Sequence, residues 1–323
     1  MRAETKRLRG ERKSAMKRGF DGNLYILAFD HRDSFQRKMF GIEGVPTEAE
    51  TAAIADAKQM IYEGALAALE QGADRAASGV LTDEQFGGSI ADEAKAAGIP
   101  FSMPVEKSGQ AEFDFEYGED FGAHIERFDP DFAKVLVRYN PEGDEAVNAR
   151  QAERLSRLSD WLHAHDRKFL FELLVPPEDA QLGQVAGDRD RFDRELLAGL
   201  MRRAIVALQE AGVEPDVWKI EGLDSRKECE SIVATCRRDG RDGVVCVVLG
   251  RGADDARLED WLRTGAPVDG YVGFAIGRTI WWDALKGFLR GDLGRAIAAD
   301  QIAAKFLRFL RAYEEAAGGP EAS

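Results

Sequence analysis

The sequence predicts a single-domain (β/α)8 TIM barrel of the α/β class, in which a closed ring of eight parallel strands is surrounded by helices. The chain has 323 residues, 44% of them apolar, which is enough for one large core. Short apolar segments alternate with longer amphipathic ones about eight times, which is the repeat of such a barrel. Several of the short segments are apolar throughout, as in V-V-C-V-V-L at 244–249. Such segments are typical of parallel strands that are buried on both faces.

The first half of the chain contains four of the expected strands, at 24–29, 75–81, 99–105 and 134–139. Helices are expected over 47–71, where Thr47 and Glu50 form a capping box, and over 83–97, which ends before Gly98. The acidic segment 112–131 is longer than an ordinary loop. We therefore expect it to be functional or to contain a small helix.

The second half repeats the alternation more regularly. Strands are expected at 168–175, 216–221, 244–249 and 270–276, and helices at 145–163, 189–211, 225–238, 253–264, 281–289 and 293–316. The expected organisation is a basic N-terminal arm or helix over 1–20, the barrel over 21–317 and a flexible tail over 318–323. An open, doubly wound sheet is the alternative, but D-H-R-D (30–33) replaces its usual glycine-rich turn after the first strand.

The charge balance limits the partners of the chain. There are 44 Lys and Arg against 58 Asp and Glu, a net charge of −14, so we expect no binding to nucleic acid or to a membrane surface. The apolar runs fall far short of the ~20 residues that cross a bilayer, and residues 1–18 lack the apolar part of a targeting signal. Three cysteines without a C-x-x-C spacing are typical of a reducing compartment. The protein is therefore expected to be soluble and cytoplasmic.

Charged residues at the carboxyl ends of barrel strands converge on one site. In order along the chain they are Asp30, His31, Arg32, Glu106, Lys107, Lys134, Arg138, Glu172, Lys219, Glu221, Arg251 and Arg278.

Lys219 interrupts an apolar strand, V-W-K-I at 217–220. An ammonium group is costly to bury, so this position favours the neutral amine, which is a nucleophile towards carbonyl groups. The structural alternative is an ion pair with Glu172 or Glu221. Lys134 also lies in an apolar strand, where it either repels the Lys219 cation or reaches solvent at the bottom of the barrel.

Two carboxylates are candidates for proton transfer. Alternation along the fifth strand points Glu172 into the barrel if Phe169, Phe171 and Leu173 face the outer helices. A carboxylate in that position carries protons or holds a lysine. Asp30 is the second candidate, and a simple turn residue at a strand end is its alternative.

Two glycine–arginine turns, G-R-G at 250–252 and G-R-T at 277–279, follow the last two strands. Loops at these positions of a barrel often bind phosphate through backbone N–H groups and a helix N-terminus. An arginine there adds a charge-assisted bond. We therefore expect phosphate binding by Gly250, Arg251, Gly252, Gly277 and Arg278.

No metal or organic cofactor is expected. The chain has 4 histidines and neither an H-E-x-x-H motif nor a cysteine cluster. His163 and His165 follow a predicted helix, so we expect them at a solvated helix end rather than on a metal.

Six segments together resemble a known family. They are L-A-F-D-H-R (27–32), K-V-L-V-R-Y (134–139), F-E-L-L-V-P-P (171–177), D-V-W-K-I-E (216–221), V-V-L-G-R-G (247–252) and G-F-A-I-G-R-T-I-W-W (273–282). The chain resembles the aldolase domain that is fused to a sugar kinase in inositol degradation and is assigned as 2-deoxy-5-keto-gluconate 6-phosphate aldolase. More distantly it is similar to the class I tagatose 1,6-bisphosphate aldolases. His31 stands where the tagatose group has glutamine, which favours the keto-gluconate phosphate.

The resemblance implies a carbon–carbon lyase that forms a Schiff base on a lysine. The implied substrate is a small phosphorylated keto-sugar acid, which is cleaved to dihydroxyacetone phosphate and malonate semialdehyde. Another phosphoketose aldolase, acting on tagatose, fructose or sulfofructose phosphates, and a sugar-phosphate-sensing regulator are the alternatives. The implied roles are Schiff-base formation by Lys219, proton transfer and charge around it by Glu172, Asp30 and Lys134, phosphate binding by Arg278 and the 250–252 turn, and substrate binding by His31, Arg32 and Glu221.

The last predicted helix carries an apolar stripe of Ile302, Phe306, Phe309 and Leu310. We expect this stripe to pack on the barrel, and packing on a second copy in a homo-oligomer is the alternative.

Overall fold

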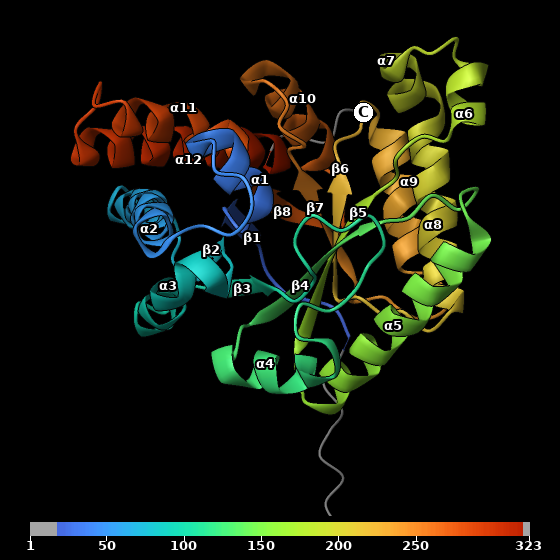
Figure 1. Cartoon of the computed structure of the whole chain (residues 1–323). Coiled ribbons are helices and arrows are strands. Elements are labelled where there is room, and N and C mark those ends of the chain that lie inside the picture. The colour runs from blue at the N-terminus through green and yellow to red at the C-terminus, as the bar shows by residue number, and fades with distance from the viewer. Residues whose placement is uncertain (1–17, 319–323) are drawn as a thin grey trace, which may run out of the picture.

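The computed structural model describes residues 18–318 and shows a closed barrel (Figure 1). The strands are parallel and pair in sequence order, and β1 pairs with β8 to close the ring. They are β1 (Leu24–Ala28), β2 (Ser78–Leu81), β3 (Phe101–Pro104), β4 (Phe132–Arg138), β5 (Lys168–Leu174), β6 (Val217–Glu221), β7 (Val245–Leu249) and β8 (Tyr271–Ile276). The predicted single-domain (β/α)8 barrel is confirmed. The predicted arm over 1–20 and tail over 318–323 lie almost wholly outside the described residues.

Helices surround the strands (Figure 1). They are α1 (Asp33–Phe35), α2 (Glu48–Glu70), α3 (Glu84–Ala96), α4 (Phe121–Phe128), α5 (Glu145–Ala164), α6 (Asp179–Gln184), α7 (Arg189–Phe192), α8 (Ala198–Glu210), α9 (Arg226–Cys236), α10 (Asp255–Gly265), α11 (Arg278–Leu289) and α12 (Arg295–Ala317). Two π-helical turns, η1 (Gln36–Phe40) and η3 (Asp193–Leu197), and a 3-10 turn, η2 (Gly118–Asp120), complete the order. None of the helices in the described part of the chain is long and apolar enough to cross a membrane.

Several predicted elements have different bounds in the structure. The second strand is confined to Ser78–Leu81, because the backbone before it turns back and the Ser78 N–H donates to the Asp74 carbonyl. The predicted helix over 189–211 is divided into α7, η3 and α8, and α6 precedes it. The acidic segment 112–131 contains η2 and α4, so the expected small helix is present. The capping box of Thr47 and Glu50 forms as predicted.

The apolar side chains divide into two cores because successive residues of each strand face opposite sides. Phe169, Phe171 and Leu173 belong to the core between the barrel and its helices, whereas Leu170 belongs to the core inside the barrel. The inward orientation of Glu172 that the sequence predicts is therefore confirmed. The interior core consists of Leu24, Ile26, Ala28, Leu81, Phe132, Leu170, Val217, Val245, Val247 and Ala275.

The stripe of α12 is buried within this chain. Ile302, Phe306, Phe309 and Leu310 are each at most 5% exposed, and α12 packs chiefly against α2, with further contacts to α10 and α11. Packing on the barrel, the expected arrangement, is what the structure shows.

Candidate functional site

A cavity of about 420 Å³ opens at the carboxyl ends of the strands. Of the residues that the sequence assigns to the site, only Glu221 does not line it; the cavity is lined by Asp30, His31, Arg32, Lys134, Glu172, Lys219, Gly250, Arg251, Gly252, Gly277 and Arg278. Barrel topology accounts for this convergence, since the strand ends all meet at one rim.

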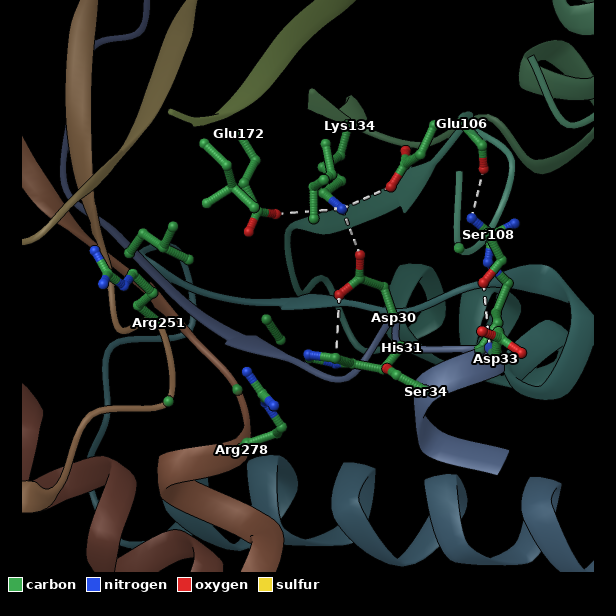
Figure 2. A pocket seen from close by; sticks show the side chains of 18 of the residues that line it. Asp30, His31, Asp33, Ser34, Glu106, Ser108, Lys134, Glu172, Arg251 and Arg278 are labelled. Carbon is green, nitrogen blue, oxygen red and sulfur yellow. Dashed lines mark hydrogen bonds and ion pairs between the residues drawn. The ribbon is translucent and has the colours of Figure 1, made fainter. Parts of the chain in front are cut away.

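The ammonium group of Lys134 is the centre of the cavity floor (Figure 2). Its Nζ donates to Asp30 Oδ2 at 2.7 Å and to Glu106 Oε1 at 2.8 Å, and lies 3.3 Å from Glu172 Oε2. The Lys134 side chain is 2% exposed. The alternative in which Lys134 reaches solvent at the bottom of the barrel is therefore wrong, because three strand-end carboxylates hold it inside.

Lys219 lies beside this group. Glu172 and Lys219 are register partners on β5 and β6, and the Lys219 Nζ donates to Glu172 Oε2 at 2.9 Å. The ion pair that the sequence left open is thus present, with Glu172 rather than Glu221 as the partner. Because Lys219 also lines the cavity, its amine is both paired and next to the space that a ligand would occupy.

The charges of the cavity floor favour the ionised forms of Asp30, Glu172 and Lys134. Burial raises the pKa of Asp30, but the facing cations, Lys134 foremost, outweigh burial and hold this pKa well below its usual range. Burial likewise opposes ionisation of Glu172, yet Lys219 and Lys134 lower its pKa. Burial disfavours the Lys134 cation, but the surrounding carboxylates raise its pKa above the ordinary value. Asp30, Glu172 and Lys134 are therefore ionised at neutral pH.

His31 is neutral at pH 7. Burial, together with the nearby Arg278 and Lys219 cations, lowers the pKa of His31 to about 4 despite the attraction of Asp30 and Glu172. Its Nδ1 lies 4.0 Å from Asp30 Oδ1 and has no hydrogen-bond partner among the described residues. The imidazole can therefore donate one hydrogen bond and accept another in the cavity.

Arg278 is one of the cations at the rim that have no carboxylate partner among the described residues. It is the first residue of α11, so the first turn of this helix, with its backbone N–H groups, begins at the rim of the cavity. Within residues 18–318 it makes no hydrogen bond or ion pair, and Figure 2 shows it next to His31 across the cavity from Lys134. Gly252, at φ +74°, lies against its guanidinium, since a Cβ there would be 3.1 Å from the Arg278 Nη2.

Gly277 permits the close approach of β8 and β1 at the same rim. A Cβ at this position would lie 2.5 Å from the Ala28 carbonyl oxygen and 3.2 Å from His31 Cε1. Any larger side chain would therefore displace the first strand end, which carries Asp30 and His31.

Arg251 and Glu221 are paired with each other at the edge of the cavity. Arg251 donates from Nη1 to Glu221 Oε2 at 2.8 Å and from Nη2 to Asp193 Oδ2 at 2.6 Å, so two carboxylates already neutralise it. Glu221 also accepts from the Val175 N–H and lines a neighbouring cavity of about 240 Å³. Glu221 holds Arg251, whose left-handed backbone at φ 48° marks a constrained turn, and substrate binding by Glu221 stays a prediction.

Arg32 lines the cavity, and its guanidinium already has partners in the structure. Its guanidinium donates to Glu116 Oε2 at 3.0 Å and to the Glu106 carbonyl, and its side chain is 4% exposed. These bonds tie the loop after β1 to the loop after β3. Arg32 therefore holds two sides of the cavity together, and its charge is already satisfied.

Three residues to which the sequence analysis gave no role belong to the site. Glu106, Lys38 and Arg138 all line the cavity. Arg138 donates only to the Gln110 carbonyl, and Lys38 makes no hydrogen bond or ion pair among the described residues. The strand-end rule placed Glu106 and Arg138 at the site without giving them a role. Lys38 could not be found in this way, because it is in η1, beyond the strand end.

The lining of the cavity is cationic. Nine Lys or Arg residues line it against four carboxylates, although the whole chain has a net charge of −14. The buried amine, the flanking carboxylates and the unpaired arginine together suit carbonyl chemistry on an anionic ligand.

The remaining predicted features lie away from the cavity. No group of three or more His, Cys, Asp and Glu residues in positions 18–318 is arranged to hold a metal ion. His165 caps the end of α5 and stacks on Trp161 at its solvent side, in keeping with the expected helix end. Cys229, Cys236 and Cys246 are free and buried, as the reduced state requires.

Comparisons with known proteins agree with the fold. The structure superposes on fructose-bisphosphate aldolase from Plasmodium falciparum, solved in complex with TRAP and a small-molecule inhibitor, with a TM-score of 0.58. The match covers 92% of this chain and 90% of that chain at 14% sequence identity, so it bears on the fold alone. No curated protein matches the chain. Residues 4–317 match the family described as "Uncharacterized protein conserved in bacteria (DUF2090)", and the chain belongs to that family.

Proposed function

We propose that the protein is a class I aldolase that cleaves a phosphorylated keto-sugar acid through a Schiff base on Lys219. The observation that carries the proposal is a buried lysine amine, 2.9 Å from a carboxylate, in a cavity that also holds Arg278, which has no partner within residues 18–318. The proposed substrate is 2-deoxy-5-keto-gluconate 6-phosphate, because the chain carries D-H-R at 30–32 as the inositol-type domains do. Another phosphoketose is the first alternative substrate.

The reaction would begin when the neutral Lys219 amine attacks the ketone next to the phosphate-bearing carbon, and loss of water gives an iminium ion. A carboxylate, Glu172 or Asp30, takes the proton of the hydroxyl group on the carbon β to the iminium. The carbon–carbon bond breaks, its electrons move into the iminium to form an enamine, and malonate semialdehyde leaves. Protonation of the enamine and hydrolysis of the imine release dihydroxyacetone phosphate and restore the amine.

The two anionic ends of this substrate would bind to different cations. Arg278, with the N–H groups at the start of α11 and the glycines at 250, 252 and 277, suits the phosphate. Arg138 and Lys38 have no carboxylate partner among the described residues, so they suit the acid end better than Arg32 does. His31 would hydrogen-bond a hydroxyl group as a neutral imidazole.

The proposal is tested by condensing dihydroxyacetone phosphate with malonate semialdehyde on the purified protein. We expect turnover that survives EDTA, because an imine rather than a metal would stabilise the carbanion. Lys219→Met should abolish turnover, and Lys227→Met, on the exposed face of α9, is the matched control. Loss of activity in EDTA would indicate a metal-dependent aldolase.

Tagatose, fructose and sulfofructose phosphates are the competing substrates in the same assay. Binding of these compounds without any turnover would favour a sugar-phosphate-sensing regulator instead. A cytoplasmic location and a small-molecule partner, without nucleic acid or membrane, accompany the proposed function.

A further inference from the structure

Glu106 contributes a third carboxylate to the floor, and one of its oxygens is unused. Its Oε1 accepts from Lys134 at 2.8 Å, whereas its Oε2 is buried and has no partner among the described residues. The side chain is 8% exposed. A buried carboxylate oxygen without a donor is costly, and the cost is smaller when the group is a neutral acid, because burial penalises an anion more than a neutral group.

A chain of contacts connects the Glu106 carboxyl group to the Lys219 amine. Lys219 Nζ lies 2.9 Å from Glu172 Oε2, which lies 3.3 Å from Lys134 Nζ, which lies 2.8 Å from Glu106 Oε1. Each neighbour is close enough for a proton to pass with only small movements. Glu106 and Lys219 are thus the two ends of one path.

A proton can shift from Lys219 to Glu106 without changing the net charge of the floor. Asp30, Glu106 and Glu172 face two ammonium groups, Lys134 and Lys219, so full ionisation buries one excess negative charge. Moving the Lys219 proton to Glu106 leaves that total unchanged and frees the amine. No proton needs to leave the buried site.

We propose that Glu106 is the internal proton acceptor that turns Lys219 into a free amine. The proton leaves Lys219 Nζ for Glu172 Oε2, and Lys134 then gives one of its protons to Glu106 and takes the proton from Glu172. At the end Lys134 is again an ammonium group, Glu172 a carboxylate, Glu106 a carboxylic acid and Lys219 an amine. Glu106 acts through Lys134, and its catalytic value rests on the proposed Schiff-base role of Lys219.

The surroundings of Glu106 agree with this assignment. Burial raises the pKa of Glu106, whereas the pKa of Asp30 and of Glu172 are lowered, so Glu106 is the carboxyl group of the three that takes a proton most readily. Two further groups face the cluster from the first strand end: Arg32, which favours the Glu106 anion, and His31, which is neutral.

The test measures the free amine directly and needs no substrate. Formaldehyde with cyanoborohydride methylates neutral amines, and peptide mass spectrometry gives the rate at Lys219, with the exposed Lys227 as internal reference. If Glu106 accepts the proton, the fraction of Lys219 that is a free amine depends on the proton shift between the two residues and not on the pH of the solvent. We therefore expect the wild-type rate at Lys219 to change little between about pH 6 and pH 8, while the rate at Lys227 rises by about tenfold per pH unit.

Glu106→Gln removes the acceptor and keeps the shape of the acid. In this variant Lys219 must release its proton to solvent, so its rate should rise as steeply with pH as that of Lys227 and should fall by at least about tenfold at pH 6. Glu106→Asp should restore a shallow profile. Glu116→Gln is the matched control. Glu116 lies in the same loop as Glu106 and contacts Arg32, but it does not contact Lys134. The pH profile of Lys219 in this variant should stay shallow.

A shallow profile in Glu106→Gln, or a steep profile in the wild type, would overturn the proposal. The wild-type profile requires no variant, so a variant that fails to fold leaves the test intact. Dihydroxyacetone phosphate is used only in a separate trapping experiment. Absence of trapping with a shallow wild-type profile would reject the proposed aldolase and leave the role of Glu106 standing.

Discussion

Arg251 and Arg278 have the same sequence context, a glycine before an arginine at the end of a strand, yet the structure separates their roles. Arg251 is held by Glu221, 30 residues away in the chain, and by Asp193, 58 residues away. Arg278 has no such partner in the described part of the chain. The strand-end rule finds both arginines, but it cannot tell which one is already neutralised. That distinction depends on side-chain partners from other strands.

Replacing each arginine by glutamine should separate binding from stability. Arg278→Gln should weaken the binding of dihydroxyacetone phosphate about 10- to 100-fold, because a charge-assisted hydrogen bond is lost. Its free energy of unfolding should stay within about 0.5 kcal/mol of the wild-type value. Arg251→Gln leaves Glu221 buried with one donor fewer, so it should lower the free energy of unfolding by about 1–3 kcal/mol. Isothermal calorimetry and urea unfolding measure the two effects. An equal loss of affinity in both variants would contradict the assignment.

His31 should make the protein sensitive to acid. Its pKa is about 4 in the folded state, below the ordinary value of 6.5, so the unfolded chain takes up a proton that the folded chain refuses. This stability is complete above about pH 6.5 and is lost as the pH falls towards 4. Between pH 7 and pH 4 the free energy of unfolding of His31→Gln should therefore fall by about 2–3 kcal/mol less than that of the wild type. Parallel pH dependences of urea unfolding for the two proteins would show that His31 does not titrate in this way.

The strands were the elements most open to prediction, and the connections were the least. Strict alternation in β5 placed Glu172 inside the barrel, because a strand exposes alternate residues to opposite faces. The sequence predicted the last strand and its glycine turn, but it placed the start of α11 three residues too late. Gly277 and Thr279 are weak helix formers, so local propensity hides the helix start at Arg278, which brings backbone N–H groups to the rim.

The loop after β3 illustrates what the sequence could not supply. It was recognised as long and acidic, but its role depends on contacts with residues distant in sequence. Arg32 reaches it from 84 residues away, and Glu106 at its base contacts Lys134. These polar contacts do not follow a periodic sequence pattern, so they cannot be predicted from hydrophobic periodicity.

Substitutions in α12 should distinguish packing within the chain from packing between copies. Phe309→Ala removes a fully buried ring and should lower the free energy of unfolding by about 3–5 kcal/mol. Ile297→Ala, on the exposed side of the same helix, should change it by less than about 0.5 kcal/mol. Urea unfolding at two protein concentrations measures both. A Phe309→Ala effect that depends on protein concentration would indicate that the stripe packs on a second copy.

At the scale of the whole molecule, an acidic protein surrounds a cationic cavity. The net charge of −14 argued against polyanionic partners, but the local excess of Lys and Arg at the strand ends suits a small phosphorylated ligand. The same topology that collects these cations also collects Asp30, Glu106 and Glu172, which keep the floor close to neutral. The cationic excess is therefore concentrated at the rim, where Arg278, Arg138 and Lys38 lie free of carboxylates among the described residues.

Salt should therefore weaken the binding of dihydroxyacetone phosphate. The Debye length falls from about 8 Å at physiological ionic strength to about 3 Å at 1 M, so the attraction of the rim for a phosphate is screened. We expect the dissociation constant from calorimetry to rise with sodium chloride in the wild type and to rise less in Arg278→Gln. A salt dependence that is the same in both proteins would assign the attraction to other charges.

Borohydride reduction shows whether Lys219 forms the proposed Schiff base. The wild-type protein is reduced in the presence of dihydroxyacetone phosphate, digested and analysed by mass spectrometry. We expect one stable adduct of the reduced triose phosphate on the peptide that contains Lys219, with none in Lys219→Met. An adduct on Lys134 or on another lysine, or no adduct in a protein that turns over the substrate, would contradict it.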